Sequence, residues 1–518
     1  MPACTYTPPL MPGRIMLMTD EKFISPENIE KVVSEAFTEH QINVERENYL
    51  MKYERGDQPI LYREKKIRSD HNAKLLENIA SRIVDIHVGY CFSNPITLVQ
   101  RARIEVGKDE KSGANDDKGI AYFNKMFAEQ RKSSKDMKLA WDLFTTGVGY
   151  QMIIPNTDPE AESSFELAVP DPRTTFVIYS NDAFRRPMVC CSYNIHRDGT
   201  IDLTAFSKNY RYEMTNAVGD FKNVSTSLNV YGFLPIVEFS LKDRMGIFEK
   251  VIPIMDCINL LDSDRVNDVT QAVQAFLWLN NCIIDHDEYE KLKEDGIIAT
   301  KNNGDGKDAN IEYISLNLDQ AQQQTFIDSL LRQVEEITST PSWQEASGGS
   351  TTGAMQLSNG WQCLEIAAKT IEQLFAESET EILKNALACI KRDNRDSVPA
   401  EIKDIQVADI EIRFCRTKTY DLVSKTNSLV SLINCGVDGL TAFNTVGLFT
   451  DSQQAYLDSK KIIDGIQEKM ISKETESKNV IPNANAAVDE NGNGGVNNKP
   501  KDKTEESLQP SKVSGVGD

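Results

Sequence analysis

Hydrophobic positions along this chain repeat every three or four residues in several long stretches, which predicts helices. The first two are residues 26–54 and a helix whose apolar side runs from Leu75 to Ile86. A third is expected over 119–146, and a fourth over 246–281, which at about 1.5 Å per residue would span roughly 52 Å. Further helical patterns cover 319–337, 355–391, 420–435 and 452–470.

Between residues 150 and 240 the pattern changes to short runs of branched and aromatic residues, which is typical of strands. Asp198-Gly199 predicts a hairpin, because glycine accepts the positive φ of a tight turn. Residues 402–416 alternate like a further strand. Separate helical and strand-rich regions indicate an α+β fold. The expected strands of the central region are 151–154, 165–169, 175–179, 188–195 and 200–206.

The order of elements in the second half of the chain is distinctive. The long helix and the helix over 319–337 enclose a small mixed insert, residues 282–318, with Gly-Asp-Gly between two expected strands. A Gly/Ser/Thr loop over 341–354 then leads into the helix over 355–391. At the ends, residues 1–20 are expected to lack fixed structure. Residues 471–518, which have no Phe, Tyr or Trp, are expected to be disordered.

Composition narrows the class of protein. The 518 residues include 57 Lys+Arg and 78 Asp+Glu, a net charge of −21, which argues against a surface that binds phosphates all over. Hydrophobic residues make up 40% and charged residues 26%, an ordinary globular composition. Ten scattered cysteines without a CxxC pair indicate free thiols and no zinc site. No stretch of about 18 mostly apolar residues is present, so no membrane span is expected.

The loop from Gly348 to Gly353 has the glycine spacing of a phosphate-binding loop. The lysine that would hold the phosphates is replaced by Ala354, and the loop lies between helices instead of after a strand. We therefore expect a flexible interhelical loop, whose glycines lower the cost of changing backbone angles, and no nucleotide cofactor.

Acidic residues on the long helix permit two interpretations. Asp264 and Asp268 lie one turn apart and form a polar stripe with Asn267 and Gln271, which is typical of a hydrated helix surface. The alternative is a metal-dependent nuclease that uses Asp262, Asp264 and Asp268. Because no catalytic triad and no GxSxG or HExxH motif occurs, the residues favour a protein that is not an enzyme and has no metal.

Several segments resemble the portal proteins of tailed bacteriophages with non-contractile tails. They are Tyr49–Arg63 (YLMKYERGDQPILYR), Asn72–Ile96 (NAKLLENIASRIVDIHVGYCFSNPI), Asn229–Phe239 (NVYGFLPIVEF) and Met245–Asp268 (MGIFEKVIPIMDCINLLDSDRVND). The last two are the most specific, and the resemblance extends over about residues 25–460.

The resemblance implies a portal fold and a ring of about twelve subunits at one capsid vertex. Its parts would be a wing, two stem helices around a clip, a tunnel loop, a long wing helix and a helical crown. A net −21 per chain would give such a ring roughly −250, so that duplex DNA is repelled by the wall and slides. The implied boundaries are a disordered 1–20, wing 21–244, stem 245–281, clip 282–318, stem 319–340, tunnel loop 341–354, long wing helix and strand 355–416, crown 417–470 and tail 471–518.

The resemblance also implies partners and contact residues. Double-stranded DNA would pass through the ring during packaging and ejection, and the terminase large subunit and head-completion or adaptor proteins would dock on the clip. Major capsid and scaffolding proteins are further expected partners, in the host cytoplasm during assembly and then in the virion. The stripe of Asp264, Asn267, Asp268 and Gln271 would belong to the stem. The tunnel-loop residues would be Gln344, Ser347, Gly348, Gly349, Ser350, Thr351, Thr352 and Gly353, and the docking residues of the clip Asp287, Glu288, Lys291, Lys293 and Glu294.

Overall fold

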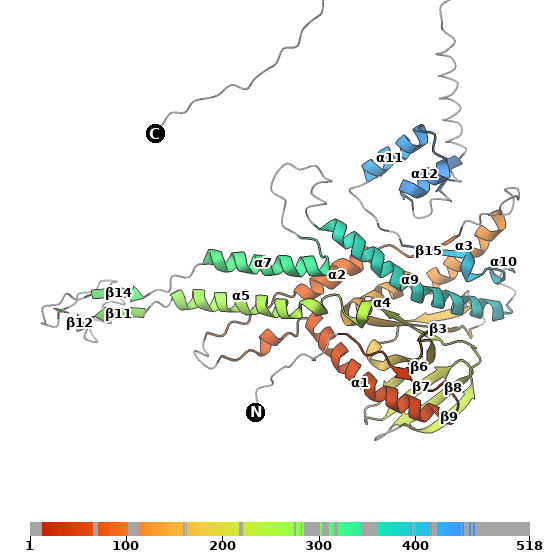
Figure 1. The fold of residues 1–518 in the computed structure, drawn as a ribbon, viewed down its shortest axis with the longest axis horizontal. Coiled ribbons are helices and arrows are strands. Elements are labelled where there is room, and N and C mark those ends of the chain that lie inside the picture. Colours follow the sequence, from red (N-terminus) through yellow and green to blue (C-terminus); the bar gives the residue numbers. More distant parts are fainter. Residues whose placement is uncertain are drawn as a thin grey trace, which may run out of the picture. The chain divides into compact units, whose positions relative to one another are not determined.

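The computed structural model shows an α+β protein that divides into two units, residues 1–452 and 453–518 (Figure 1). The described residues are 13–65, 71–101, 113–158, 161, 163–216, 221–273, 276–280, 282–283, 301–302, 310–314, 320–342, 360–395, 398, 400–414, 416, 422–446, 448–449, 455–456 and 459–460. In the second unit the described residues 455–456 and 459–460 are helical.

The central strands form two sheets. The larger has the order β1-β5-β6-β7-β8-β9 and is antiparallel except for the parallel pair β1–β5. The smaller has the order β10-β3-β4. Asp198-Gly199 forms the predicted hairpin between β6 and β7, with φ +83° at Gly199. The strands are β1 (Met18–Thr19), β3 (Val148–Pro155), β4 (Phe165–Ala168), β5 (Thr175–Ser180), β6 (Pro187–Ile195), β7 (Ile201–Ser207), β8 (Tyr210–Asn216), β9 (Lys222–Leu228) and β10 (Ile236–Ser240).

Helices cover these sheets and form the main core. α1 (Ile29–Glu54) packs Ile29, Val33 and Ala36 against the larger sheet. α2 (Ile79–Phe92), α4 (Lys132–Thr146) and α9 (Trp361–Arg392) enclose the largest apolar cluster together with β3, β4 and β10. The other helices named within the described residues are α3 (Gly113–Glu129), α5 (Ile252–Val273), α7 (Gln320–Thr338), α10 (Ala400–Lys403), α11 (Leu422–Asn434) and α12 (Gly439–Val446), and the short 3-10 helices there are Pro59–Tyr62, Pro172–Thr174, Lys242–Arg244, Glu249–Val251 and Val407–Asp409.

The expected helix over 246–281 is too long. α5 ends at Val273, and residues 276–280 form strand β11 (Phe276–Asn280), which pairs with β14 (Asn310–Ile314). Their bulky and aromatic residues fit a strand, and the pairing partner lies about thirty residues away, beyond the reach of local periodicity. Because β11 belongs to the insert, the insert begins within the range assigned to the helix. The insert also contains the pair β12 (Cys282–Ile283) and β13 (Lys301–Asn302).

Two other predicted elements are shorter than expected. The helix expected over 119–146 is two helices, α3 and α4, because Arg131 between them has φ +52°. Of the strand expected over 402–416, the part that forms among the described residues is β15 (Ile410–Arg413), which is paired with β2 (Thr97–Gln100). The residues directly before β15, Val407–Asp409, form a 3-10 helix that is stabilised by a capping box between Gln406 and Asp409.

The expectation that residues 1–20 lack structure is wrong for residues 13–20. Arg14 is buried, and its Nη2 donates to both carboxylate oxygens of Glu249 at 2.6 and 2.7 Å. Asn43 of α1 accepts from the backbone N–H of Ile15 and donates to its carbonyl oxygen. β1 then pairs with β5, so this segment fastens the sheet to the residues that lead into α5. Residues 1–12 lie outside the described part of the chain.

Candidate functional site

The feature that sequence reasoning missed is an extended segment, residues 71–78, that lies along α5. The sequence placed Leu75 and Leu76 in a helix, but α2 begins only at Ile79. The backbone N–H groups of Ala73, Leu75 and Glu77 instead donate to side chains of α5 at 2.8, 2.9 and 2.8 Å. These backbone groups are therefore satisfied without helix formation.

The acceptors on α5 are Asn267, Ser263 and Asn259, spaced four residues apart on one helix face and almost fully buried. Four helical residues rise about 6 Å, and two extended residues span about 6.6 Å. Alternate amides of the extended segment therefore meet successive turns of α5, in a contact that we call the α5 ladder. Asn259 extends it by donating to Gln58 Oε1 at 2.7 Å.

The ladder changes the interpretation of the predicted polar stripe. Asn267 is 2% exposed and is a ladder residue, so a hydrated position is wrong for it. Asp264 is partly exposed and pairs with Arg63 and Lys65 at 2.7 and 2.9 Å. Although partial burial opposes its charge, these two cations hold the pKa of Asp264 below its usual value. Gln271 lies in α5, but its side chain is outside the described part of the structure.

The alternative nuclease site receives no geometric support. Asp264 already forms ion pairs with the side chains of Arg63 and Lys65. Burial raises the pKa of Asp262, which disfavours the ionised form of the carboxyl group that binds a metal. Across the described ranges, no three His, Cys, Asp or Glu side chains are grouped so that they could hold a metal ion.

α7 lies beside α5 on the side away from the ladder (Figure 1). Arg265 of α5 donates to Gln324 of α7, and the buried Ile327 and Val334 of α7 join the main core. The two helices leave apolar side chains exposed on their outer flanks. Val266 and Val269 of α5 are 41% and 49% exposed, and Phe326 and Ile337 of α7 are 53% and 52% exposed. We call these four residues the outer flanks of α5 and α7.

α9 follows the predicted tunnel loop and is fixed to the body at its middle. Lys132 of α4 contacts Asp136 at 2.7 Å and Glu379 of α9 at 3.0 Å, and all three side chains are buried. Although burial opposes the charge on the ammonium group, the two carboxylates together raise the pKa of Lys132. Burial raises the pKa of Asp136 and of Glu379, with Lys132 acting against it.

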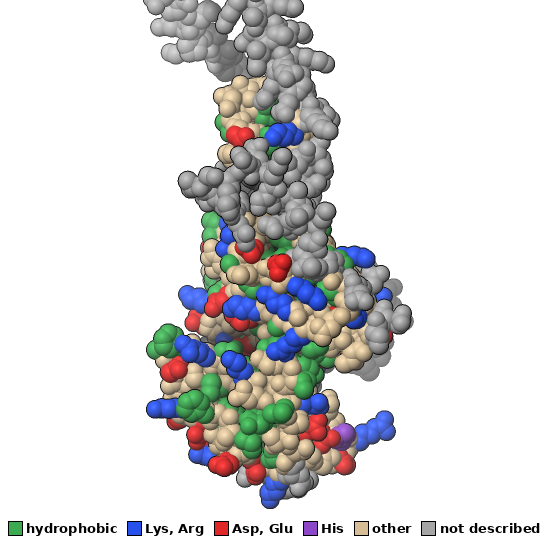
Figure 2. Space-filling model, turned by 90° about the vertical axis from the view of Figure 1, so that its right-hand side faces the viewer, with side chains coloured by type: hydrophobic (Ala, Val, Ile, Leu, Met, Phe, Trp, Pro, Cys, Tyr) green, Lys and Arg blue, Asp and Glu red, His purple; other side chains and the backbone are tan. Residues whose placement is uncertain are grey.

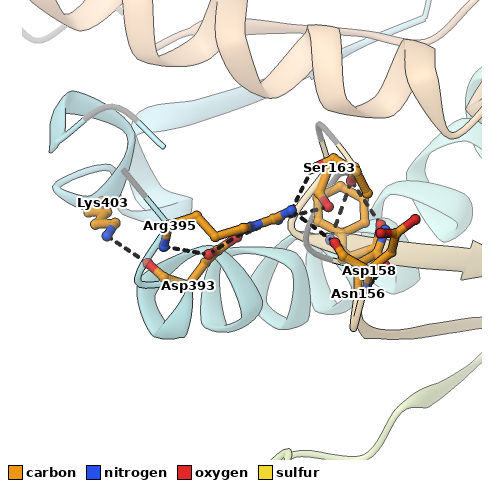
Figure 3. A network of polar contacts seen from close by, with 8 residues as sticks. Asn156, Asp158, Ser163, Asp393, Arg395 and Lys403 are labelled. Atoms are coloured by element: carbon orange, nitrogen blue, oxygen red, sulfur yellow. Dashed lines mark hydrogen bonds and ion pairs between the residues drawn. The ribbon is translucent and has the colours of Figure 1, made fainter. Parts of the chain in front are cut away.

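The end of α9 is fixed by Arg395, which reaches toward the loop between β3 and β4 (Figure 3). Its Nη2 donates to the Ser163 carbonyl oxygen at 3.0 Å and its Nη1 to that of Asp158 at 3.3 Å. Burial acts to raise the pKa of Asp393, but the hydrogen bonds from Arg395 outweigh it and lower that pKa to about 2. Together with the buried lysine cluster, this contact fixes α9 to the body at its middle and at its end.

The other predicted contact residues lie outside the described part of the chain. These are the tunnel-loop residues Gln344 and Ser347 to Gly353 and the clip residues Asp287 to Glu294. On the face shown in Figure 2, Lys and Arg side chains are mixed with Asp, Glu and hydrophobic ones, a distribution that does not concentrate positive charge for nucleic acid.

The family of this chain follows from a comparison of its sequence with family models. The family described as phage portal protein, SPP1 Gp6-like, matches residues 35–427, which is more than half of the chain. The chain belongs to this portal protein family. A comparison with curated proteins gave no match.

Membership in the portal family gives the chain a portal role in the phage capsid and places it in a structural, non-enzymatic family. The matched range includes α5, α7, α9 and the extended segment of the ladder. Within the described residues, no helix has both the length and the apolar character that a membrane crossing needs.

The ladder should make a measurable contribution to the stability of this portal-family chain. Asn259→Ala would leave the N–H of Glu77 and the amide oxygen of Gln58 without their partners, both beside a fully buried position. We expect a loss of about 1–3 kcal/mol in the free energy of unfolding and faster hydrogen exchange at residues 73–77. Thr270→Ala, at an exposed position of α5, is the control. Equal exchange at 73–77 in the two variants would contradict the ladder.

Proposed function

We propose that this chain forms a ring of about twelve copies at one capsid vertex, through which double-stranded DNA is packaged and later ejected. The match of the portal family to residues 35–427 carries this proposal. Residues 21–244 would form the wing, α5 and α7 the stem and residues 276–318 the clip. Residues 341–354 would form the tunnel loop, and α11 and α12 would belong to the crown.

The outer flanks of α5 and α7 support a ring. Val266, Val269, Phe326 and Ile337 are each about half exposed, on helices that already use their other faces for the ladder and the core. The α7 surface also has an open groove of about 460 Å³, lined by Ala321, Gln322, Thr325, Phe326 and Ser329. A ring needs two different surfaces on each copy, one for each neighbour. We assign these contacts to copies of the same chain.

The charges of the two helices suit a channel that does not hold DNA. α5 carries four aspartates and one arginine, and α7 carries one aspartate, two glutamates and one arginine. Each phosphate that a cation neutralises adds affinity through counterion release, and an acidic pair of helices offers few such contacts. Duplex DNA would therefore slide past this wall.

The partners are assigned to the parts around the stem. We propose that Asp287, Glu288, Lys291, Lys293 and Glu294 meet the terminase large subunit and the head-completion proteins. Energy would come from the terminase, since the Gly348–Gly353 loop has no phosphate-binding lysine.

Electron microscopy of the purified protein tests the ring directly. We expect particles with a central hole wide enough for a DNA duplex, and mass photometry should give about twelve copies per particle. A protein that stays monomeric at high concentration would overturn the proposal.

A further inference from the structure

The chain that leaves β15 toward α11 is fastened to the start of α9 by Arg416. Its Nη1 donates to Glu365 at 3.1 Å and its Nη2 to Glu372 at 2.7 Å. The two carboxylates lie seven residues apart on α9, so one guanidinium bridges two helical turns. The side chains of Arg416, Glu365 and Glu372 are only 11–19% exposed.

A side chain of α2, Tyr90, also contacts this cluster. The hydroxyl of Tyr90 donates to Glu365 at 2.6 Å, and the Arg416 guanidinium lies 5.6 Å from the centre of the Tyr90 ring. The ring of Trp361, the first residue of α9, lies 6.0 Å from that of Tyr90. Residues far apart in the sequence therefore meet around one cation, where Coulomb and cation–π attraction act together.

The charge balance of the cluster depends on Glu372. Burial raises the pKa of Glu372 to about 7, the charge of Arg416 acts to lower it, and that of Glu365 acts to raise it. Among the described residues, the other charged or titratable groups nearby are Lys369 on α9, whose side chain is 66% exposed, and the Cys91 thiol on α2. Since bound Arg416 favours the ionised carboxylate, protonation of Glu372 and attachment of Arg416 oppose each other by linkage.

We propose that Arg416, Glu365, Glu372 and Tyr90 form an acid-sensitive clasp that holds the chain after β15 against the first turns of α9. With Glu372 ionised, Arg416 bridges both carboxylates and the clasp is closed. With Glu372 protonated, Arg416 keeps only Glu365, and the segment from β15 to Arg416 is held less tightly. α11 begins at Leu422, so Arg416 is the last described residue before that helix.

Hydrogen exchange on the full-length protein tests the clasp. After correction for the intrinsic effect of pH, we expect protection of residues 410–416 to fall at least threefold between about pH 8 and pH 6 in the wild type. Glu372→Gln, which imitates the protonated acid, and Arg416→Gln should give low protection at both pH values. Glu381→Gln removes an exposed pairing with Lys384 on the same helix and should respond to pH as the wild type does.

Two outcomes would overturn the clasp: wild-type protection that does not change with pH, or a Glu372→Gln variant that responds as the wild type does. The particle mass of each sample is measured in parallel. Loss of the pH response in a variant that still assembles supports the clasp. If no sample forms rings, the wild type included, the proposed function is contradicted, but the hydrogen-exchange result still tests the clasp.

Discussion

Replacing Val266 and Val269 with aspartate is expected to prevent ring assembly while leaving the subunit folded. In the free chain the two side chains are 41% and 49% exposed, so aspartate at these positions stays hydrated. In a ring, the interface would lose about 2 kcal/mol of apolar burial and would have to desolvate two carboxylates. The affinity between neighbouring copies should fall at least a hundredfold, which mass photometry across a concentration series measures.

The matched control is a double variant, Ile195→Asp/Leu228→Asp, at two side chains that are 63% and 72% exposed on the larger sheet. This variant introduces the same two charges on exposed apolar positions and should form rings. Circular dichroism checks that both variants fold. Rings of normal mass from the α5 variant would show that Val266 and Val269 do not lie in the contact between copies.

The second large effect is expected at the buried lysine. Lys132→Met removes the cation that contacts both Asp136 and Glu379, and it leaves two carboxyl groups buried without a counter-charge. We expect the free energy of unfolding to fall by about 3–5 kcal/mol, because an uncompensated buried charge costs that much. Lys384→Met, which breaks an exposed ion pair on α9, should change it by less than about 1 kcal/mol.

The loss should depend on pH in a defined direction. The pKa values of Asp136 and Glu379 are above those of the unfolded chain, and removing Lys132 raises them further. A carboxyl group with a raised pKa favours the fold while it is protonated, and this advantage disappears as the pH rises through that pKa. Urea unfolding should therefore show a smaller defect near pH 5 than near pH 8. A defect of equal size at both would contradict the buried cluster as its cause.

The sequence predicts the elements whose signal is local. The strands around 165–206 and the hairpin at Gly199 are confirmed, because alternation and a turn residue act over a few neighbours. The predicted start of α2 and the predicted end of α5 were wrong, because contacts with residues far away in the sequence determine where these helices begin and end. Ser263 and Asn267 hold residues 73–75 extended, and β14 draws residues 276–280 into a strand.

The contacts of the polar residues on α5 could likewise not be predicted from local sequence. The spacing of Asp264, Asn267 and Asp268 on one helix could be read from the sequence, but not what each side chain would meet. Asn267 faces a backbone segment almost 200 residues away in the sequence, and Asp264 faces Arg63. Polar residues four apart on a helix are typical of a wet surface, and only the distant segment makes Asn259, Ser263 and Asn267 a buried row. An uncharged asparagine–serine–asparagine row at four-residue spacing, on a helix whose other polar residues are mostly charged, is the signal that could have indicated it.

The contact between Arg14 and Glu249 has a consequence for how the protein is made. The two residues are separated by 235 positions, and the ribosome adds about 5–20 residues per second, so Arg14 waits on the order of ten to fifty seconds for its partner. Until then the segment that brings Met18 and Thr19 to the β5 edge is held through Asn43 but lacks its Arg14 anchor, and a weakly held edge strand invites pairing with other nascent chains. Slower translation should lengthen this window and increase the aggregated fraction.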